Sequence, residues 1–250
     1  MSPIIVIIGW ILWAALGAIG LKLLLQARRI RALPELLVGL YFLGGTVIGH
    51  GPILVFLSLP ELKETAPDVV YWINVVSRFG ISTAPMILGL FAWRVFRPQV
   101  RRAAIAAVTI ALVAVVTACI GVGSPSAELA QQQPLVYWLA VLSGATAYTW
   151  CSLEAFVNYR SGRKRVALGL SDPIVINRFL LWAIWSGVCV VLSSANVAAV
   201  FASGGTPTGL ALTVLSIVYL TGGVVNLVVV WLIFVPPRFY RTRIASFAAA

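Results

Sequence analysis

The chain has 250 residues, of which 61% are hydrophobic and 10% charged, and its mean hydropathy is +1.01. Soluble domains are about half apolar and about a quarter charged, so this composition argues against a soluble protein and indicates one built for a lipid bilayer. The net charge of +11 would suggest nucleic-acid binding in a soluble protein. Here the cations sit mainly in short connections between apolar segments, so we expect no nucleic-acid partner.

Seven apolar segments are long enough to cross a hydrocarbon core of about 30 Å, which takes roughly 20 helical residues. In chain order they cover about residues 3–25, 35–59, 69–93, 103–122, 135–159, 174–201 and 208–235. Little sequence is left for a soluble unit. We therefore predict an all-α polytopic membrane bundle with seven transmembrane helices, formed as one domain by residues 1–250.

The connections between these segments alternate in charge. Fourteen Lys or Arg residues lie in the connections after the first, third, fifth and seventh segments, whereas the alternate connections carry only Lys63. An excess of cations in cytoplasmic loops is the positive-inside pattern. It predicts an N-terminus outside and a C-terminus in the cytoplasm, with the basic loops close to anionic headgroups of the bilayer. No basic residue precedes the first segment, so we expect an uncleaved anchor.

Local signals mark several helix starts and bends. Ser171 or Asp172 is suited to cap the sixth segment, with Pro173 at its first helical position. Pro52 and Pro85 lie inside the second and third segments and should kink them. Such kinks open space for a ligand or water in some bundles and serve only packing in others.

Arg78 lies near the middle of the third segment. A guanidinium at bilayer depth costs roughly 2.5–3.5 kcal/mol on insertion scales, so the folded protein or a ligand must supply its partners. His50, the only histidine, lies at a matching depth of about 14 Å from the outer end of its segment. It is either a satisfied interior side chain or a proton-sensitive group beside Arg78. Gly45 and Gly49 form a GxxxG pair that suits a contact within the bundle or between chains.

Polar residues recur at helical spacing in the second, third, fifth, sixth and seventh segments, which predicts a shared polar core. The alternative is that they are interhelical contacts worth about 0.6 kcal/mol each. The candidate ligand-binding residues are Arg78, His50, Asn74, Ser82 and Trp185.

Glu154 is the only acid well inside a segment, and Arg178 lies at a similar depth in the next one. Both are roughly 6–8 Å inside the cytoplasmic boundary. We predict that they form an ion pair, which is either structural or a switch in a transport or signalling cycle.

Several chemistries are disfavoured. The three lysines, Lys22, Lys63 and Lys164, lie outside the last segment, so a retinal Schiff base there is ruled out. One histidine is too few for bis-histidine haem or for a zinc hydrolase. The three cysteines show no CxxC spacing and are expected to be free thiols. We therefore expect no cofactor, no metal and no enzymatic activity.

Two motifs carry a family resemblance. Residues 169–182 read GLSDPIVINRFLLW, and residues 31–40 read RALPELLVGL. In these stretches the chain resembles a family of uncharacterised bacterial seven-helix membrane proteins, over most of its length. The resemblance implies seven spans and a location in the bacterial cytoplasmic membrane, and it implies no activity.

For function, the sequence favours a receptor-like or sensory protein that recognises a small, possibly anionic, molecule in a polar pocket between the helices. Its output would need a cytoplasmic or membrane protein partner. One alternative is a small-solute transporter that uses the same polar core as its path. The other is a non-catalytic scaffold subunit, in which the polar groups only hold helices together.

Overall fold

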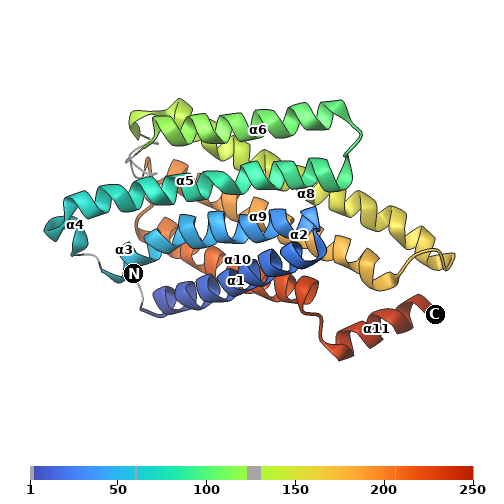
Figure 1. Ribbon diagram of the computed structural model, residues 1–250. Helices are drawn as coiled ribbons and strands as arrows, with labels where there is room; N and C mark the ends of the chain where they lie inside the picture. Colours follow the sequence, from blue (N-terminus) through green and yellow to red (C-terminus); the bar gives the residue numbers. More distant parts are fainter. Residues whose placement is uncertain (1–2, 60, 123–130, 206, 250) are drawn as a thin grey trace.

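The computed structural model describes residues 3–59, 61–122, 131–205 and 207–249, and this part of the chain is helical with no strands (Figure 1). The helices of the first half are α1 (Pro3–Ile30), α2 (Leu33–Tyr41), η1 (Phe42–His50), α3 (Gly51–Ser58), α4 (Leu62–Thr65), α5 (Pro67–Phe91) and η2 (Ala92–Phe96). The remainder are α6 (Arg101–Ile120), α8 (Pro134–Ala167), α9 (Pro173–Ala202), α10 (Gly209–Phe234) and α11 (Arg238–Ala249). The elements α2, η1 and α3 follow one another directly and are called the second helix below.

Each of the seven predicted segments is helical, but six helices in the described part of the chain are long and apolar enough to cross a membrane. They are Val6–Ile30, Leu33–Phe56, Pro67–Phe96, Arg101–Ile120, Pro173–Ala202 and Gly209–Phe234. The predicted fifth segment, in α8, is not among them. Hydroxyl and aromatic side chains such as Thr146, Tyr148 and Thr149 reduce its hydropathy. The six apolar helices indicate a membrane-embedded, multi-pass protein.

The predicted cap of the sixth segment is confirmed, Pro85 lies inside α5, and the second helix is widened ahead of Pro52. The Asp172 carboxylate accepts a hydrogen bond of 2.8 Å from the backbone N–H of Ile174, which confirms it as the cap of α9. Residues Phe42–His50 form a π-helix ahead of Pro52. A proline ring collides with the carbonyl four residues earlier in a regular α-helix, and the wider π turn relieves that contact. The second helix therefore has a widened segment of nine residues ahead of Pro52.

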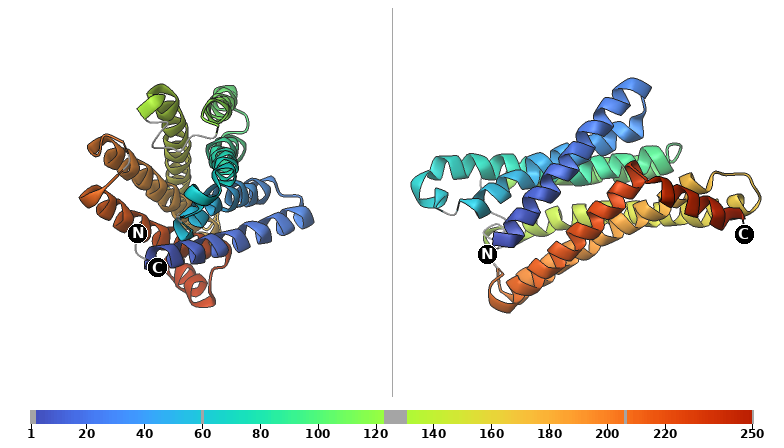
Figure 2. Two further views of the ribbon diagram at one scale, coloured as in Figure 1. Left: turned by 90° about the vertical axis from the view of Figure 1, so that its left-hand side faces the viewer. Right: turned by 90° about the horizontal axis from the view of Figure 1, so that it is seen from below.

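The long helices close into a ring around the bundle axis (Figure 2). Helix α1 packs against the second helix and α10, α10 against α9, α9 against α8, and α8 against α5, which returns to the second helix. Helix α6 packs across α5 and α8. Gly45 and Gly49 lie against Ala84 and Gly80 of α5, so this GxxxG pair makes a contact within the bundle.

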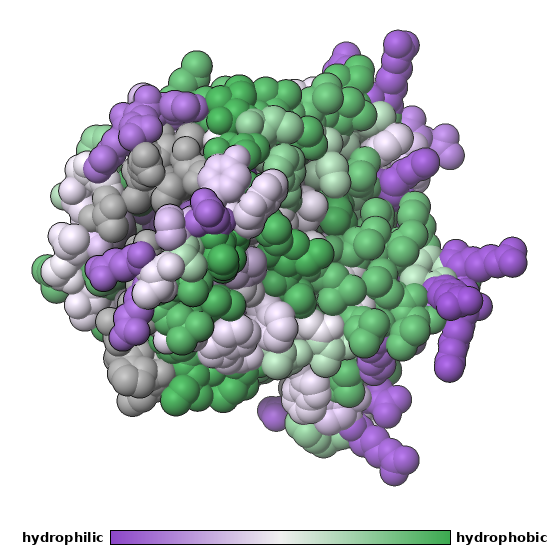
Figure 3. Space-filling view, turned by 60° about the vertical axis from the view of Figure 1, so that its left-hand side comes forward, coloured by the Kyte–Doolittle hydropathy of each residue, from purple (hydrophilic) through white to green (hydrophobic). Residues whose placement is uncertain are grey.

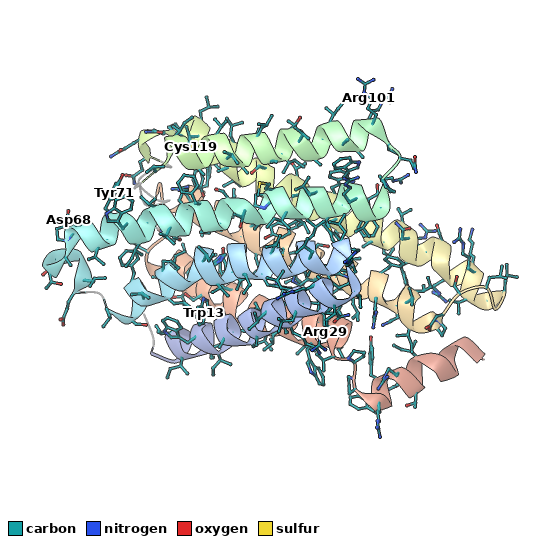
Figure 4. The ribbon with its side chains drawn as sticks, in the orientation of Figure 1. Trp13, Arg29, Asp68, Tyr71, Arg101 and Cys119 are labelled. Carbon is teal, nitrogen blue, oxygen red and sulfur yellow. The ribbon has the colours of Figure 1, made fainter. Side chains whose placement is uncertain are left out.

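Hydrophilic residues gather at both ends of the bundle (Figure 3), and the labelled residues of opposite charge lie at different ends (Figure 4). Arg29 and Arg101 lie at one end, which we call the basic end, and Asp68 and Tyr71 lie at the other, the N-terminal end. Apolar residues cover the surface between them, with exposed side chains such as Ile11, Leu112 and Val191. Such a belt between charged ends is what a bilayer requires of a helical bundle.

Candidate functional site

Arg78 and His50 lie across the same close helix contact in the N-terminal half of the bundle. Ser77, the neighbour of Arg78, donates a hydrogen bond of 2.6 Å to the carbonyl of Gly49, the neighbour of His50. A Cβ added at Gly49 would lie 2.7 Å from the backbone nitrogen of Ile81. The two backbones therefore touch at this point. The glycine contact sets Arg78 and His50 at one level, as predicted from their depths.

Thr46 and His50 lie on the ring-facing side of the second helix. Gly49 contacts α5, Gly51 contacts α1, and Ile48 is 49% exposed on the outer surface. The remaining side, opposite Ile48, carries Thr46 and His50. His50 is nevertheless exposed. The ring is thus only loosely filled beside this side chain.

Arg78 and Asn74 lie on the side of α5 that turns from the second helix toward α6 and α8. Ser77 and Ala84 face the second helix, and Gly89 faces α6. With about 100° of rotation per residue, Asn74 falls midway between these two contacts, and Arg78 falls about 20° from that of Gly89. Both side chains are half-buried, and Arg78 has an interaction of its own in the structure.

The histidine ring has a defined proton arrangement. His50 Nδ1 lies 2.7 Å from the carbonyl oxygen of Gly45. Because a carbonyl only accepts hydrogen bonds, Nδ1 must carry a proton and donate it. In the neutral ring Nε2 is then an acceptor. A guanidinium and an imidazole acceptor therefore share one level of the ring.

The basic half of the ring is closed by aromatic side chains. Tyr41 and Tyr148 hydroxyls are 2.8 Å apart, and the ring of Trp185 meets that of Tyr41 edge-on with centroids 5.1 Å apart. Trp182 and Phe91 extend the cluster. The void that they leave is about 10 Å³, which is room for one water at most. We call these residues the aromatic plug.

Five buried side-chain atoms of the described residues have no hydrogen-bond partner, and two of them belong to Tyr137 of α8 and Asn226 of α10. The Tyr137 hydroxyl is unpartnered although its side chain is 4% exposed, and so is the Asn226 carbonyl oxygen. Asn226 donates instead to the Cys189 sulfur at 3.5 Å. Tyr219, 44% exposed, lies within electrostatic range of Tyr137. Leaving such a group unsatisfied costs about 1–3 kcal/mol, so these atoms are suited to contact a ligand or water.

The structure does not bring together all five predicted ligand residues. Arg78, His50 and Asn74 lie in the N-terminal half. Trp185 is 3% exposed within the aromatic plug. Ser82 lines an apolar groove of about 210 Å³ between η1, α5 and α6, on the outer side of α5. Spacing along one helix could not separate these positions, because Ser82 lies only 40° from Arg78 on a helix with about 100° per residue.

Sequence reasoning missed Tyr137 as a site residue. Tyr137 lies near the start of a helix beside Trp138, and such a position is typical of the aromatic residues that line a membrane–water interface. Its burial depends on packing in the ring, which a single segment does not reveal. Asn226 lay on a recognised polar stripe of the last segment, but that stripe gave no sign of an unsatisfied oxygen.

The predicted Glu154–Arg178 ion pair is wrong. Arg97 Nε donates to Glu154 Oε1 at 2.8 Å, and this hydrogen bond raises the pKa of Arg97. Arg178 is exposed. The error arose because Arg97 was counted as a loop cation, whereas the turn after η2 carries it back against α8. The pair ties α5 to α8 at the basic end.

Comparison of the chain with protein-family models, curated proteins and solved structures returns no match. The class that the fold defines is a helical, membrane-embedded, multi-pass protein. No group of three or more metal-binding side chains occurs in the described residues.

Proposed function

We propose that the protein is a receptor-like membrane protein that binds a small anion in the N-terminal half of its ring. Helix α8 completes the ring as a seventh membrane span, with the basic end in the cytoplasm. The observation that supports the site is the contrast within the ring. In the N-terminal half His50 is exposed and the buried Tyr137 hydroxyl has no partner, whereas the aromatic plug in the basic half leaves a void of only about 10 Å³.

The chemistry of these side chains restricts the ligand. Arg78 supplies a permanent cation with a planar fork of donors, which suits a carboxylate or phosphate. His50 Nε2 accepts a hydrogen bond when the ring is neutral, because Nδ1 is bound to Gly45. The preferred ligand is therefore a small anion that also carries a hydroxyl donor, such as a hydroxycarboxylate.

The closed plug favours a receptor over an open path. A ligand that enters from the N-terminal end meets Tyr41, Tyr148 and Trp185, and no passage remains between them. A signal would cross by movement of helices. The π-helix η1 joins the plug at Phe42 to His50, and π segments are frequent at functional sites.

The test is ligand-induced stabilisation of the detergent-solubilised chain by lactate, gluconate, acetate and phosphate. A ligand at about 100 times its Kd stabilises the folded state by about 2.7 kcal/mol, which raises the melting temperature by several degrees. Arg78→Gln should abolish this shift. Arg102→Gln, an exposed cation at the basic end, should retain it. A shift that survives Arg78→Gln contradicts the site.

The transporter remains a second candidate because η1 could move the plug. Reconstitution in liposomes separates the two functions. A receptor stabilised by an anion should carry no labelled anion across the bilayer, whereas a transporter should show flux that Arg78→Gln removes. If Arg78→Gln lowers stability and no anion shifts the melting temperature of the native chain, the scaffold role is the better description.

A further inference from the structure

Helix α8 is longer than a membrane span requires. Its 34 residues extend about 51 Å, against a hydrocarbon core of about 30 Å. The distance from Pro134 to Glu154 alone is about 30 Å. Glu154 also pairs with Arg97, the residue directly after the apolar span Pro67–Phe96. The pair thus marks the basic-end boundary of the hydrocarbon core, and α8 continues beyond it.

The helical ends beyond this boundary form a connected structure, which we call the projecting unit. It comprises residues 155–178 and α11 (Figure 1). Gly162 of α8 lies directly against the side chain of Ile176 in α9. Asn177 donates a hydrogen bond of 2.6 Å to the Tyr240 hydroxyl of α11. These contacts hold the three helical pieces together outside the ring.

The projecting unit carries most of the net charge of the protein. It contains eight Lys or Arg residues and one acid, Asp172, which gives +7 of the total +11. The cations are Arg160, Arg163, Lys164, Arg165, Arg178, Arg238, Arg241 and Arg243.

Part of this charge lies beyond the headgroup region. Arg163, Lys164 and Arg165 are about 14–17 Å along α8 from Glu154. The headgroup region is only about 5–8 Å deep on each side of the core, and screening limits its field to about 8 Å beyond. All three side chains are exposed. Their charge is available to a partner in water.

The unit also exposes large apolar side chains, two of them in the turn between α8 and α9 and one near the start of α11. Leu168 and Leu170 are each 72% exposed and Phe239 is 70% exposed. Leu168, directly after α8, lies about 21 Å along the helix from Glu154 and is therefore beyond the headgroups. Exposed apolar side chains beside a cationic helix end suit a partner that offers both carboxylates and an apolar stripe. Nucleic acid has no counterpart for the leucines.

We propose that the projecting unit is a docking surface for an acidic, amphipathic segment of another protein. Arg163, Lys164 and Arg165 pair with its carboxylates, and Leu168 and Leu170 contact its apolar face. The surface is separate from the anion site in the ring. It rests on the placement of the basic end outside the bilayer, and not on binding of a small ligand.

The test uses the full chain in phosphatidylcholine nanodiscs, which carry no anionic lipid. The probe is a fluorescent 20-residue peptide designed as an amphipathic helix with one Glu face and one Leu face, followed by anisotropy. The triple variant R163Q/K164Q/R165Q should weaken binding about tenfold or more. The control R28Q/R29Q/R31Q removes the same charge from exposed residues at the same end and should weaken it less than about threefold.

A second variant and two competitors complete the design. L168S/L170S should weaken binding of the peptide but leave that of polyglutamate, which has no apolar face, unchanged. Equal losses in the two triple variants would overturn the proposal, because they would show attraction to net charge alone. So would tighter binding of a single-stranded oligonucleotide than of the peptide, or loss of peptide binding in phosphatidylglycerol nanodiscs. No small anion is present, so a failure here leaves the ring site untouched.

Discussion

The two halves of the ring differ in how tightly the same helix faces are packed. On α9, Trp182, Trp185 and Cys189 are buried in the basic half, whereas Ser193 and Asn196, on the same face nearer the N-terminal end, are half-buried. In the basic half the hydroxyls of Tyr41 and Tyr148 satisfy one another. In the N-terminal half, the hydroxyl of Tyr137 has no partner. The filled aromatic plug in the basic half thus contrasts with the half-buried polar faces nearer the N-terminal end.

The largest difference in stability between the two halves should appear when side chains of α9 are truncated. Trp185→Ala removes a fully packed indole from the plug and should destabilise the protein by about 3–5 kcal/mol. Ser193→Ala, two turns away on the same face, should change stability by less than about 0.5 kcal/mol. Unfolding of both variants by titration with a denaturing detergent measures this. Equal losses would show that the N-terminal half is packed as tightly as the plug.

Removal of single hydroxyls sharpens the comparison. Tyr148→Phe leaves the Tyr41 hydroxyl buried without a partner and should cost about 1–3 kcal/mol. Tyr137→Phe removes a hydroxyl that is already unpartnered, so it should be neutral or stabilising in the absence of ligand. The same unfolding measurement applies. A clear loss of stability in Tyr137→Phe would mean that this hydroxyl is satisfied, and the proposed site would lose one of its contacts.

The sequence was sufficient for the helices, because apolar length and charge alternation are local properties of the chain. The Asp172 cap and the common level of Arg78 and His50 also followed from local spacing. Other features depend on packing between distant segments. The burial of Tyr137 and the outward position of Ser82 are set by which neighbours surround α8 and α5. The π turn ahead of Pro52 and the helix α11 beyond the last span lay outside the hydropathy pattern.

The smallest expected effect concerns the boundary between the ring and the projecting unit. Arg97→Gln removes the ion pair with Glu154, whose second oxygen is already buried without a partner. Because Arg97 is exposed, we expect a small fall in melting temperature that is present at low ionic strength and disappears near 1 M salt, where the Debye length is about 3 Å. Arg178 is the partner of Glu154 that the sequence predicted. Arg178→Gln should leave the melting temperature unchanged. The reverse result, with loss only in Arg178→Gln, would restore the sequence-based pairing and would remove the marker that places the end of α8 outside the bilayer.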